Sequence, residues 1–220
     1  MEELRCDRLW SFEHSLGGEF LRQFAYPWEA LPHIGAFIHS LASLLRGEYE
    51  NRGEDVWVHK TASVSSTAEI IGPCVICEGA EVRHCAFIRG SALVGKGAVV
   101  GNSTELKNVI LFDGVQVPHY NYVGDSILGY KAHMGAGSIT SNMKSDKTNV
   151  RVVCGTDGYE TGLRKFGAAL GDFVEVGCNS VLNPGTVVGK NSVIYPLSMV
   201  RGAVPAGSIY KKQGEIVDRR

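Results

Sequence analysis

The chain has 220 residues, of which 44% are hydrophobic, and its 22 basic and 23 acidic side chains leave a formal net charge of -1. These values indicate a globular protein with one large core and argue against nucleic acid or an anionic membrane as a partner. No apolar run approaches the roughly 20 residues that span a bilayer, and the first residues lack the order of a signal peptide, so we expect a cytoplasmic protein.

The first 52 residues are predicted to form an N-terminal helical cap. Apolar residues recur there with the i, i+3, i+4, i+7 spacing of an amphipathic helix that ends near Gly47, at Ile34, Phe37, Ile38, Leu41, Leu44 and Leu45. We expect residues 1–52 to close the N-terminal end of the structure that follows.

A six-residue repeat begins after this segment. Aliphatic residues recur without a miss at Val58, Val64, Ile70, Ile76, Val82, Ile88, Val94, Val100 and Leu106. Small residues follow four positions later, at Ala62, Ala68, Cys74, Ala80, Ala86, Ala92, Ala98 and Thr104. The six-residue step returns at Leu170, Val176, Leu182, Val188, Ile194 and Val200. This pattern predicts a mainly β protein, a parallel β-helix of hexapeptide repeats over residues 53–210, followed by a tail at 211–220.

The spacing also predicts which residues stack. The step shortens to five from Leu106 to Leu111 and from Val123 to Leu128. With three faces per coil, we expect two columns of neighbours: Ile88, Leu106 and Val123 in one, and Val100, Val117 and Met134 in the other.

Residues 143–165 interrupt the repeat. The turn signal Thr156-Asp-Gly158 between β-prone runs predicts a hairpin in this excursion. Long excursions from a regular scaffold are often functional.

The six cysteines are predicted to be free thiols. Cys74 and Cys77 form a lone CxxC without a second pair, which is weak evidence for zinc, and Cys74 falls in the small inward position of the repeat. We therefore expect a structural role for both and no metal in the chemistry.

Arg89 and Lys107 each follow an inward aliphatic residue and lie 18 residues apart, so they should stack on one face. Two stacked cations could clamp a phosphate or carboxylate. Exposed basic residues at solenoid corners would give the same pattern, and the spacing does not choose between the two.

His119 and Ala136 each lie two residues after a member of one column, so the imidazole should stack beside the backbone of Gly135-Ala-Gly137. A histidine removes a proton near neutral pH, and backbone N–H groups of such a turn can hold an oxyanion, which suits acyl transfer. A corner histidine bonded to a carbonyl group is the alternative.

Four motifs in this order resemble one family: "GNSTELKN" (101–108), "PHYNYVGDSILG" (118–129), "GAGSITSN" (135–142) and "KFGAALGD" (165–172). They are similar to the C-terminal acetyltransferase half of the bifunctional glucosamine-1-phosphate acetyltransferase / N-acetylglucosamine-1-phosphate uridylyltransferase. They also resemble the archaeal-type sugar-1-phosphate nucleotidylyltransferases with the same β-helical half. The resemblance covers about residues 56–210 and implies a left-handed helix with three hexads per coil.

The resemblance implies a homotrimer with active sites between subunits, which transfers acetyl from acetyl-CoA to the amine of glucosamine 1-phosphate in UDP-N-acetylglucosamine biosynthesis. Carried over by motif, His119 is the general base and Ala136 offers its N–H to the thioester carbonyl. Tyr122 and Asn142 contact the sugar and the reacting groups. The implied phosphate ligands are Arg89, Lys107 and Lys165.

Several positions depart from the family pattern. His133 stands where the family has an asparagine in the sugar site, and Met143 where it has a tyrosine. The acetyl-CoA cleft positions are Cys178 and Pro196, and proline has no N–H to donate. Lys212 in the tail is a candidate for the CoA phosphates. These changes leave donor and acceptor open.

The nucleotidylyltransferase half needs a nucleotide-binding α/β domain, and 52 mainly helical residues are too few for it, so we expect that activity to be missing or supplied by a separate partner. One alternative is a non-catalytic sugar-phosphate-binding or scaffold protein of the same fold. Cys178 as an acyl nucleophile is a further alternative, but no base is assigned to it. A zinc site like that of β-helical carbonic anhydrases is disfavoured, because the seven histidines show no closely spaced pair on one coil.

Overall fold

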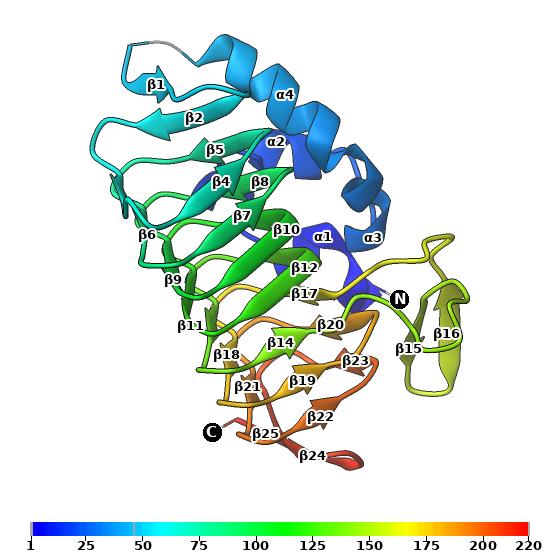
Figure 1. Ribbon diagram of the computed structural model, residues 1–220. Coiled ribbons are helices and arrows are strands. Elements are labelled where there is room, and N and C mark those ends of the chain that lie inside the picture. The colour runs from blue at the N-terminus through cyan, green and yellow to red at the C-terminus, as the bar shows by residue number, and fades with distance from the viewer. Residues whose placement is uncertain (1, 46, 220) are drawn as a thin grey trace.

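The computed structural model describes residues 2–45 and 47–219, and these form a parallel β-helix flanked by a helical segment (Figure 1). The coils have three sides. Side 1 contains β2 (Val56–His59), β5 (Cys74–Ile76), β8 (Ala92–Val94), the second halves of β10 (Glu105–Leu111) and β12 (Tyr122–Leu128), β17 (Ala168–Leu170), β20 (Thr186–Val188) and β23 (Ala203–Val204).

Sides 2 and 3 complete each coil. Side 2 contains β3 (Ser63–Val64), β6 (Glu81–Val82), β9 (Val99–Asn102), β11 (Gln116–His119), β13 (His133–Met134), β18 (Glu175–Val176), β21 (Val193–Ile194) and β24 (Ser208–Lys212). Side 3 contains β4 (Glu69–Ile71), β7 (Phe87–Arg89), the first halves of β10 and β12, β14 (Ile139–Thr140), β19 (Val181–Leu182) and β22 (Met199–Val200).

The hexapeptide interpretation and its register are confirmed. Leu106 of β10 pairs with both Ile88 and Val123, and Val117 of β11 pairs with Val100. Gln116 pairs with His133, which brings Met134 into the column of Val117. These inward side chains are fully buried, so the aliphatic ladder is the core of the solenoid.

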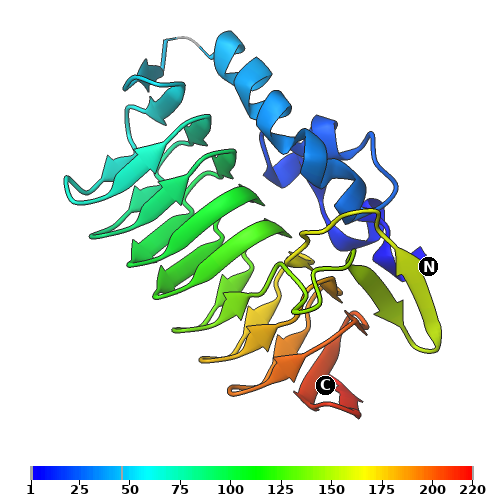
Figure 2. The same cartoon turned by 45° about the vertical axis from the view of Figure 1, so that its right-hand side comes forward.

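The N-terminal segment closes the end of the stack only through its last residues, and not through its helices as expected. Its helices are η1 (Glu2–Leu4), α1 (Cys6–Leu9), η2 (Phe12–His14), α2 (Gly18–Leu21), α3 (Pro27–Ala30), η3 (Leu31–His33) and α4 (Ile34–Leu44). They cover side 1, with α4 packed against β5, β8 and β10. Figure 2 shows α4 running beside the first coils and the earlier helices beside the middle ones. The N-terminal edge of side 1 is instead covered by β1 (Tyr49–Asn51), a strand near the end of the same segment, which pairs antiparallel with β2.

This position of the segment follows from the outward residues of side 1. Val75, Leu93, Ile110 and Ile127 point away from the solenoid core and are nevertheless buried. Strands with both faces buried lack polar alternation, and each such side chain contributes roughly 1.5–3 kcal/mol when removed from water. The helices therefore supply the second layer that side 1 requires.

The excursion forms the predicted hairpin, from β15 (Arg151–Cys154) and β16 (Asp157–Glu160), which projects from the solenoid (Figures 1 and 2). The two-residue turn is Gly155-Thr156, where Gly155 has a φ of +59°, and it precedes the predicted Thr156-Asp-Gly158 by one residue. At the other end of the chain, β25 (Glu215–Asp218) pairs antiparallel with β24. Within residues 2–45 and 47–219, no helix is long and apolar enough to cross a membrane.

Chemical labelling distinguishes the cysteines. Burial raises the pKa of Cys6 and of Cys77 to about 12 and raises that of Cys74 as well, whereas Cys85 and Cys178 are exposed. Because the thiolate is the reactive form, native protein should be alkylated rapidly at the two exposed cysteines and not at the three buried ones. Peptide mass spectrometry after a short iodoacetamide pulse measures this, and early labelling of Cys74 would contradict the buried position of the CxxC.

Candidate active site

A buried carboxylate organises the corner between sides 3 and 1. Asp125, which is 4% exposed, accepts hydrogen bonds from Lys107 Nζ (2.7 Å) and Asn108 Nδ2 (3.0 Å) on one oxygen and from Asn142 Nδ2 (2.6 Å) on the other. Its backbone is left-handed, with a φ of +47°, which turns the chain around the corner. Asp125 thus fixes side chains from the coils on either side of its own.

Tyr122 extends this network along side 3. Its hydroxyl accepts a hydrogen bond from Asn142 Nδ2 at 3.1 Å. Burial, followed by the negative charge of Asp125, raises the pKa of Tyr122, so the phenol stays protonated and can donate to a ligand. The structure therefore brings the predicted residues Tyr122 and Asn142 together.

Arg89 and Lys107 stack as predicted, because Ile88 pairs with Leu106 and each cation follows one of these residues. Each cation already has a carboxylate partner. Arg89 Nε lies 2.6 Å from Glu105 Oε1, and Lys107 Nζ lies 2.7 Å from Asp125 Oδ1. Their charges are therefore compensated within the chain.

A cavity of about 510 Å³ opens beside Asp125, and we call it the excursion cavity. Its floor is polar, formed by Asn108 and Asp125. Its apolar walls come from the N-terminal segment and the excursion, at Leu31, Pro32, Met143 and Leu163. Two cations from the end of the excursion, Arg164 and Lys165, complete the lining. Lys165 is thus close to the network of Asp125, as expected for a site residue.

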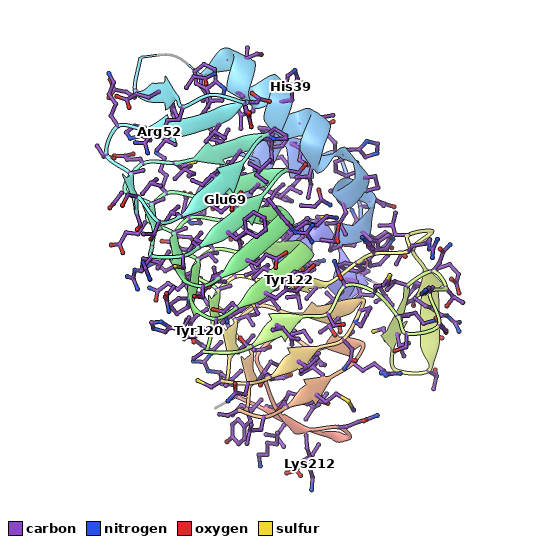
Figure 3. All side chains as sticks on the ribbon, viewed as in Figure 1. His39, Arg52, Glu69, Tyr120, Tyr122 and Lys212 are labelled. Atoms are coloured by element: carbon purple, nitrogen blue, oxygen red, sulfur yellow. The ribbon has the colours of Figure 1, made fainter. Side chains whose placement is uncertain are left out.

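His119 is the last residue of β11. It lies at the corner where the chain turns from side 2 to side 3. Its side chain is exposed, and its carbonyl oxygen accepts the N–H of Gly137 at 3.0 Å. The predicted stacking of the coil at His119 on the coil at Ala136–Gly137 is thus present in the backbone. Figure 3 shows its neighbour Tyr120 at this corner and Tyr122 on the adjoining strand face.

The residues expected to contact the acyl donor continue this corner column. Asn179 N–H donates to Ala136 O at 2.8 Å, and Leu197 N–H donates to Cys178 O at 2.9 Å. The column therefore runs from His119 through Ala136 and Cys178 to Pro196. Glycine allows the coils to approach closely in this column, because a Cβ on Gly177 would lie 2.4 Å from the nitrogen of Pro196.

Lys212 lies one coil beyond Pro196, since Ile194 pairs with Tyr210 and the same strand continues to Lys212. Its ammonium group pairs with Glu215 at 3.3 Å and remains exposed near the C-terminal end (Figure 3). Lys212 is thus in the corner column but far from His119.

A single chain does not bring His133 to Tyr122 and Asn142. It lies on β13 of side 2, and its Nδ1 is 2.8 Å from Glu175 Oε2. Tyr122 and Asn142 lie on side 3, across the corner. Within one chain, His133 therefore belongs to a different surface.

Sequence reasoning missed Asp125, Asn108 and Arg164. A signal for the first two was present, because Asn108, Asp125 and Asn142 recur at intervals of 17 residues. That interval is the length of a coil shortened by one five-residue step, so it predicts a polar column. Arg164 has no such signal, since the excursion separates it from the repeat.

The register, the inward aliphatic ladder and the corner column place the chain in the class of hexapeptide-repeat β-helix proteins. It is a relative of bifunctional nucleotidylyltransferase/acetyltransferase proteins. The bifunctional protein GlmU of Methanococcus maripaludis strain C5 is 31% identical over 202 residues, covering 90% of this chain and 49% of that protein. The bifunctional sugar-1-phosphate nucleotidylyltransferase/acetyltransferase of Sulfurisphaera tokodaii is 31% identical over 174 residues, covering 71% of this chain and 43% of that protein.

The chain spans about half the length of the curated relatives it matches. The protein-family model described as the GMPPB C-terminal domain matches residues 70–157. Among solved structures, the acetyltransferase domain of PglB from Neisseria gonorrhoeae is 16% identical, with a TM-score of 0.37, over 82% of this chain and 63% of that one.

Proposed function

We propose that the chain is an acetyl-CoA-dependent N-acetyltransferase that acts on an amino-sugar 1-phosphate such as glucosamine 1-phosphate, in nucleotide-sugar biosynthesis. The observation that supports this most is the position of His119. It stands at the head of the corner column and next to the strand face with Tyr122 and Asn142. An acyl donor in the column and a sugar on the face would meet at its imidazole.

The proposed reaction is direct transfer. His119 takes a proton from the substrate amine as the amine nitrogen attacks the thioester carbon, and the C–N bond forms. The tetrahedral intermediate then collapses with cleavage of the C–S bond, and the proton passes to the departing CoA thiolate. The products are the N-acetylated sugar phosphate and CoA. No covalent acyl-enzyme is required, so Cys178 needs no nucleophilic role.

Ala136 is the proposed oxyanion donor. Its carbonyl is used by Asn179, but its N–H has no hydrogen-bond acceptor within residues 2–45 and 47–219. A free N–H directly below His119 could donate to the thioester oxygen as negative charge develops there.

The assembly and partners of the chain follow the same proposal. We propose a cytoplasmic homotrimer in which a neighbouring subunit completes the site. In that assembly, His133 would contribute to a site at the boundary between two subunits. Because the relatives are named as bifunctional proteins, a nucleotidylyltransferase, whether in the same chain or separate, is the proposed user of the product.

A non-catalytic sugar-phosphate-binding protein is the second candidate. Pro196 favours it, because a proline in the proposed donor column has no N–H to offer a pantetheine or thioester oxygen. In this second candidate function, the Asp125 network is retained but the chain does not bind acyl-CoA productively.

An assay panel distinguishes the two functions. We expect acetyl-CoA to be consumed in the presence of one or more amino-sugar 1-phosphates and not with the corresponding N-acetylated sugars, which lack a free amine. Release of CoA thiol measures turnover, and calorimetry with acetyl-CoA and with each sugar phosphate measures binding. Sugar-phosphate binding without any acetyl-CoA binding would refute the transferase proposal and support the binding protein.

A further inference from the structure

A second cavity, of about 600 Å³, opens at the corner between sides 1 and 2, and we call it the aromatic cavity. Its lining consists of Lys131, Phe173, Glu175, Asn191, Gly207 and Arg219. The chain crosses side 2 between Phe173 and Cys178, so the aromatic cavity and the corner column that contains Cys178 lie at opposite edges of that side. No residue assigned above to the acyl donor or the acceptor lines this cavity, and its volume is that of a small-molecule site.

Two residues of the aromatic cavity have a backbone conformation that suits other residue types better. At this corner, left-handed residues of successive coils stack through backbone hydrogen bonds, at Gly79, Gly97, Gly114, Lys131, Phe173, Asn191 and Gly207. Glycine adopts this conformation freely and asparagine tolerates it, whereas lysine and phenylalanine are disfavoured there. Lys131 (φ +53°) and Phe173 (φ +59°) lie on adjacent coils and line the same cavity. Disfavoured backbone conformations cluster at binding sites, which indicates a function for this pair.

An aromatic surface forms one wall of the cavity. The side chain of Phe173 is 44% exposed, and its ring stands at 80° to the ring of Tyr130, with 5.3 Å between the centroids. Tyr130 in turn stacks on His14 of the N-terminal segment, at 3.8 Å between centroids. Because its neighbours hold it in place, the Phe173 ring offers a fixed stacking surface to a planar ligand such as a nucleobase.

Two cations of the cavity are available to phosphate groups. Lys131 Nζ lies 5.1 Å from the ring centroid of Tyr130, and Arg219 Nη1 donates to Asn191 O at 3.0 Å. In the described part of the chain, neither cation forms an ion pair with a carboxylate, so both can contact phosphate oxygens. Asn191 stacks two coils beyond Lys131, a separation of roughly 10 Å, which a diphosphate bridges more readily than a single phosphate does.

The acidic residue of the lining suits the ribose of a nucleotide. Glu175 Oε2 lies 2.8 Å from His133 Nδ1, which fixes the carboxylate and leaves Oε1 free to accept a hydrogen bond from a ribose hydroxyl group. A free phosphate would gain the cations but would also meet this negative charge. A nucleotide makes favourable contacts with the ring, the cations and the carboxylate together.

We infer that the aromatic cavity binds a nucleoside diphosphate. The base stacks on Phe173, the phosphates contact Lys131 and Arg219, and the ribose donates hydrogen bonds to Glu175. This site is separate from the acyl-donor column and from the Asp125 network, so it goes beyond the proposed acetyl transfer. The N-terminal segment contributes to it through His14, which supports the ring of Tyr130 from behind.

Calorimetry on the full chain tests the inference, with UDP, ADP and GDP as nucleotide probes and inorganic pyrophosphate as a probe without a base. We expect at least one nucleotide to bind more tightly than pyrophosphate does, because pyrophosphate has no ring to stack on Phe173. Lys131→Gln and Arg219→Gln should each weaken binding of that nucleotide about tenfold, the usual effect of losing a hydrogen bond to a charged group. Lys96→Gln removes an exposed cation from the same corner, two coils before Lys131 and outside the cavity, and should leave the dissociation constant unchanged.

Variants of Phe173 separate stacking from charge. Phe173→Gly introduces the residue that four other coils have at this corner, so the fold should be retained, and urea denaturation checks this. The loss of the ring should weaken nucleotide binding about tenfold and should not weaken pyrophosphate binding. Phe173→Tyr keeps an aromatic ring and should bind the nucleotide as the wild type does.

Competition with acetyl-CoA identifies the occupant of the cavity. Acetyl-CoA should not displace the bound nucleotide, because the proposed donor column lies across side 2. Displacement would assign the cavity to the adenine nucleotide of the acyl donor and overturn the inference. Equal nucleotide affinity in Phe173→Gly and wild type would also overturn it, as would a wild-type chain that binds none of the three nucleotides. None of these measurements requires acetyl transfer, so a failure here would leave the proposed function untouched.

Discussion

Replacing His119 with alanine should lower the rate of acetyl transfer by about 10²- to 10⁴-fold, the usual contribution of a positioned general base. The fold should survive, because the side chain of His119 is exposed and the hydrogen bonds of His119 within the described residues are made by its backbone. Its N–H donates to Asn121 Oδ1 at 3.1 Å, and its carbonyl accepts the N–H of Gly137. Single-turnover rates with saturating acetyl-CoA and sugar phosphate measure the loss, and calorimetry checks that both substrates still bind.

His84→Ala is the matched control. His84 occupies the same corner position two coils earlier, where its carbonyl accepts the N–H of Ser103 at 3.2 Å. It lies outside the proposed site, so its removal should leave the transfer rate unchanged. If His119→Ala keeps a tenth or more of the wild-type rate, His119 is not the base, even if the chain proves to be an acetyltransferase.

Replacing Asp172 with alanine should lower the free energy of unfolding by about 3 kcal/mol, the lower end of the range for breaking a buried ion pair. The carboxylate is 1% exposed and lies 2.9 Å from Lys190 Nζ. It also accepts the N–H groups of Ser11 (2.8 Å) and Tyr130 (2.9 Å). The lower end applies because the Lys190 side chain is 27% exposed and can be hydrated when its partner is lost.

Urea denaturation measures this change, and limited proteolysis shows where it acts. Because Asp172 joins the N-terminal segment to the solenoid, cleavage within residues 2–33 should accelerate in Asp172→Ala before the β-helix unfolds. Asp146→Ala removes an exposed carboxylate from the excursion, whose partners Lys144 and Thr148 lie in the same excursion, and should change the midpoint far less than Asp172→Ala does. Equal midpoints for Asp172→Ala and wild type would contradict the anchoring role.

The sequence was sufficient for the solenoid because its contacts are periodic. Each inward residue stacks on the residue one coil away, so a step such as Leu106 to Val123 is readable from spacing alone. The same regularity predicted the column of His119 and Ala136. The left-handed φ of Asp125 and its three hydrogen bonds were not readable, because counting inward aliphatic residues says nothing about corner geometry.

The packing of the N-terminal helices against side 1 was not predicted, although the sequence contains a pattern that indicates it. Outward positions on side 2 are often polar, as at Glu81, Gln116 and Glu175, whereas those on side 1 are apolar, as at Leu93 and Ile110. A solenoid side that is apolar on both faces requires a second layer. The apolar outward positions of side 1 therefore predict that the helices lie on side 1 and not at the end of the stack.

The bond between Trp10 and Leu170 has a consequence for how the protein folds. Trp10 Nε1 donates to Leu170 O at 2.8 Å across a sequence separation of 160 residues. During synthesis, the coil that receives Trp10 emerges from the ribosome long after Trp10 itself. The residues around Trp10 must therefore wait, with their apolar side chains uncovered, until the coil that contains β17 is made, whereas α4 can pack as soon as β5, β8 and β10 are present. A nascent chain arrested before residue 170 should bind chaperones through this segment, and release from them should coincide with completion of the coil that holds Leu170.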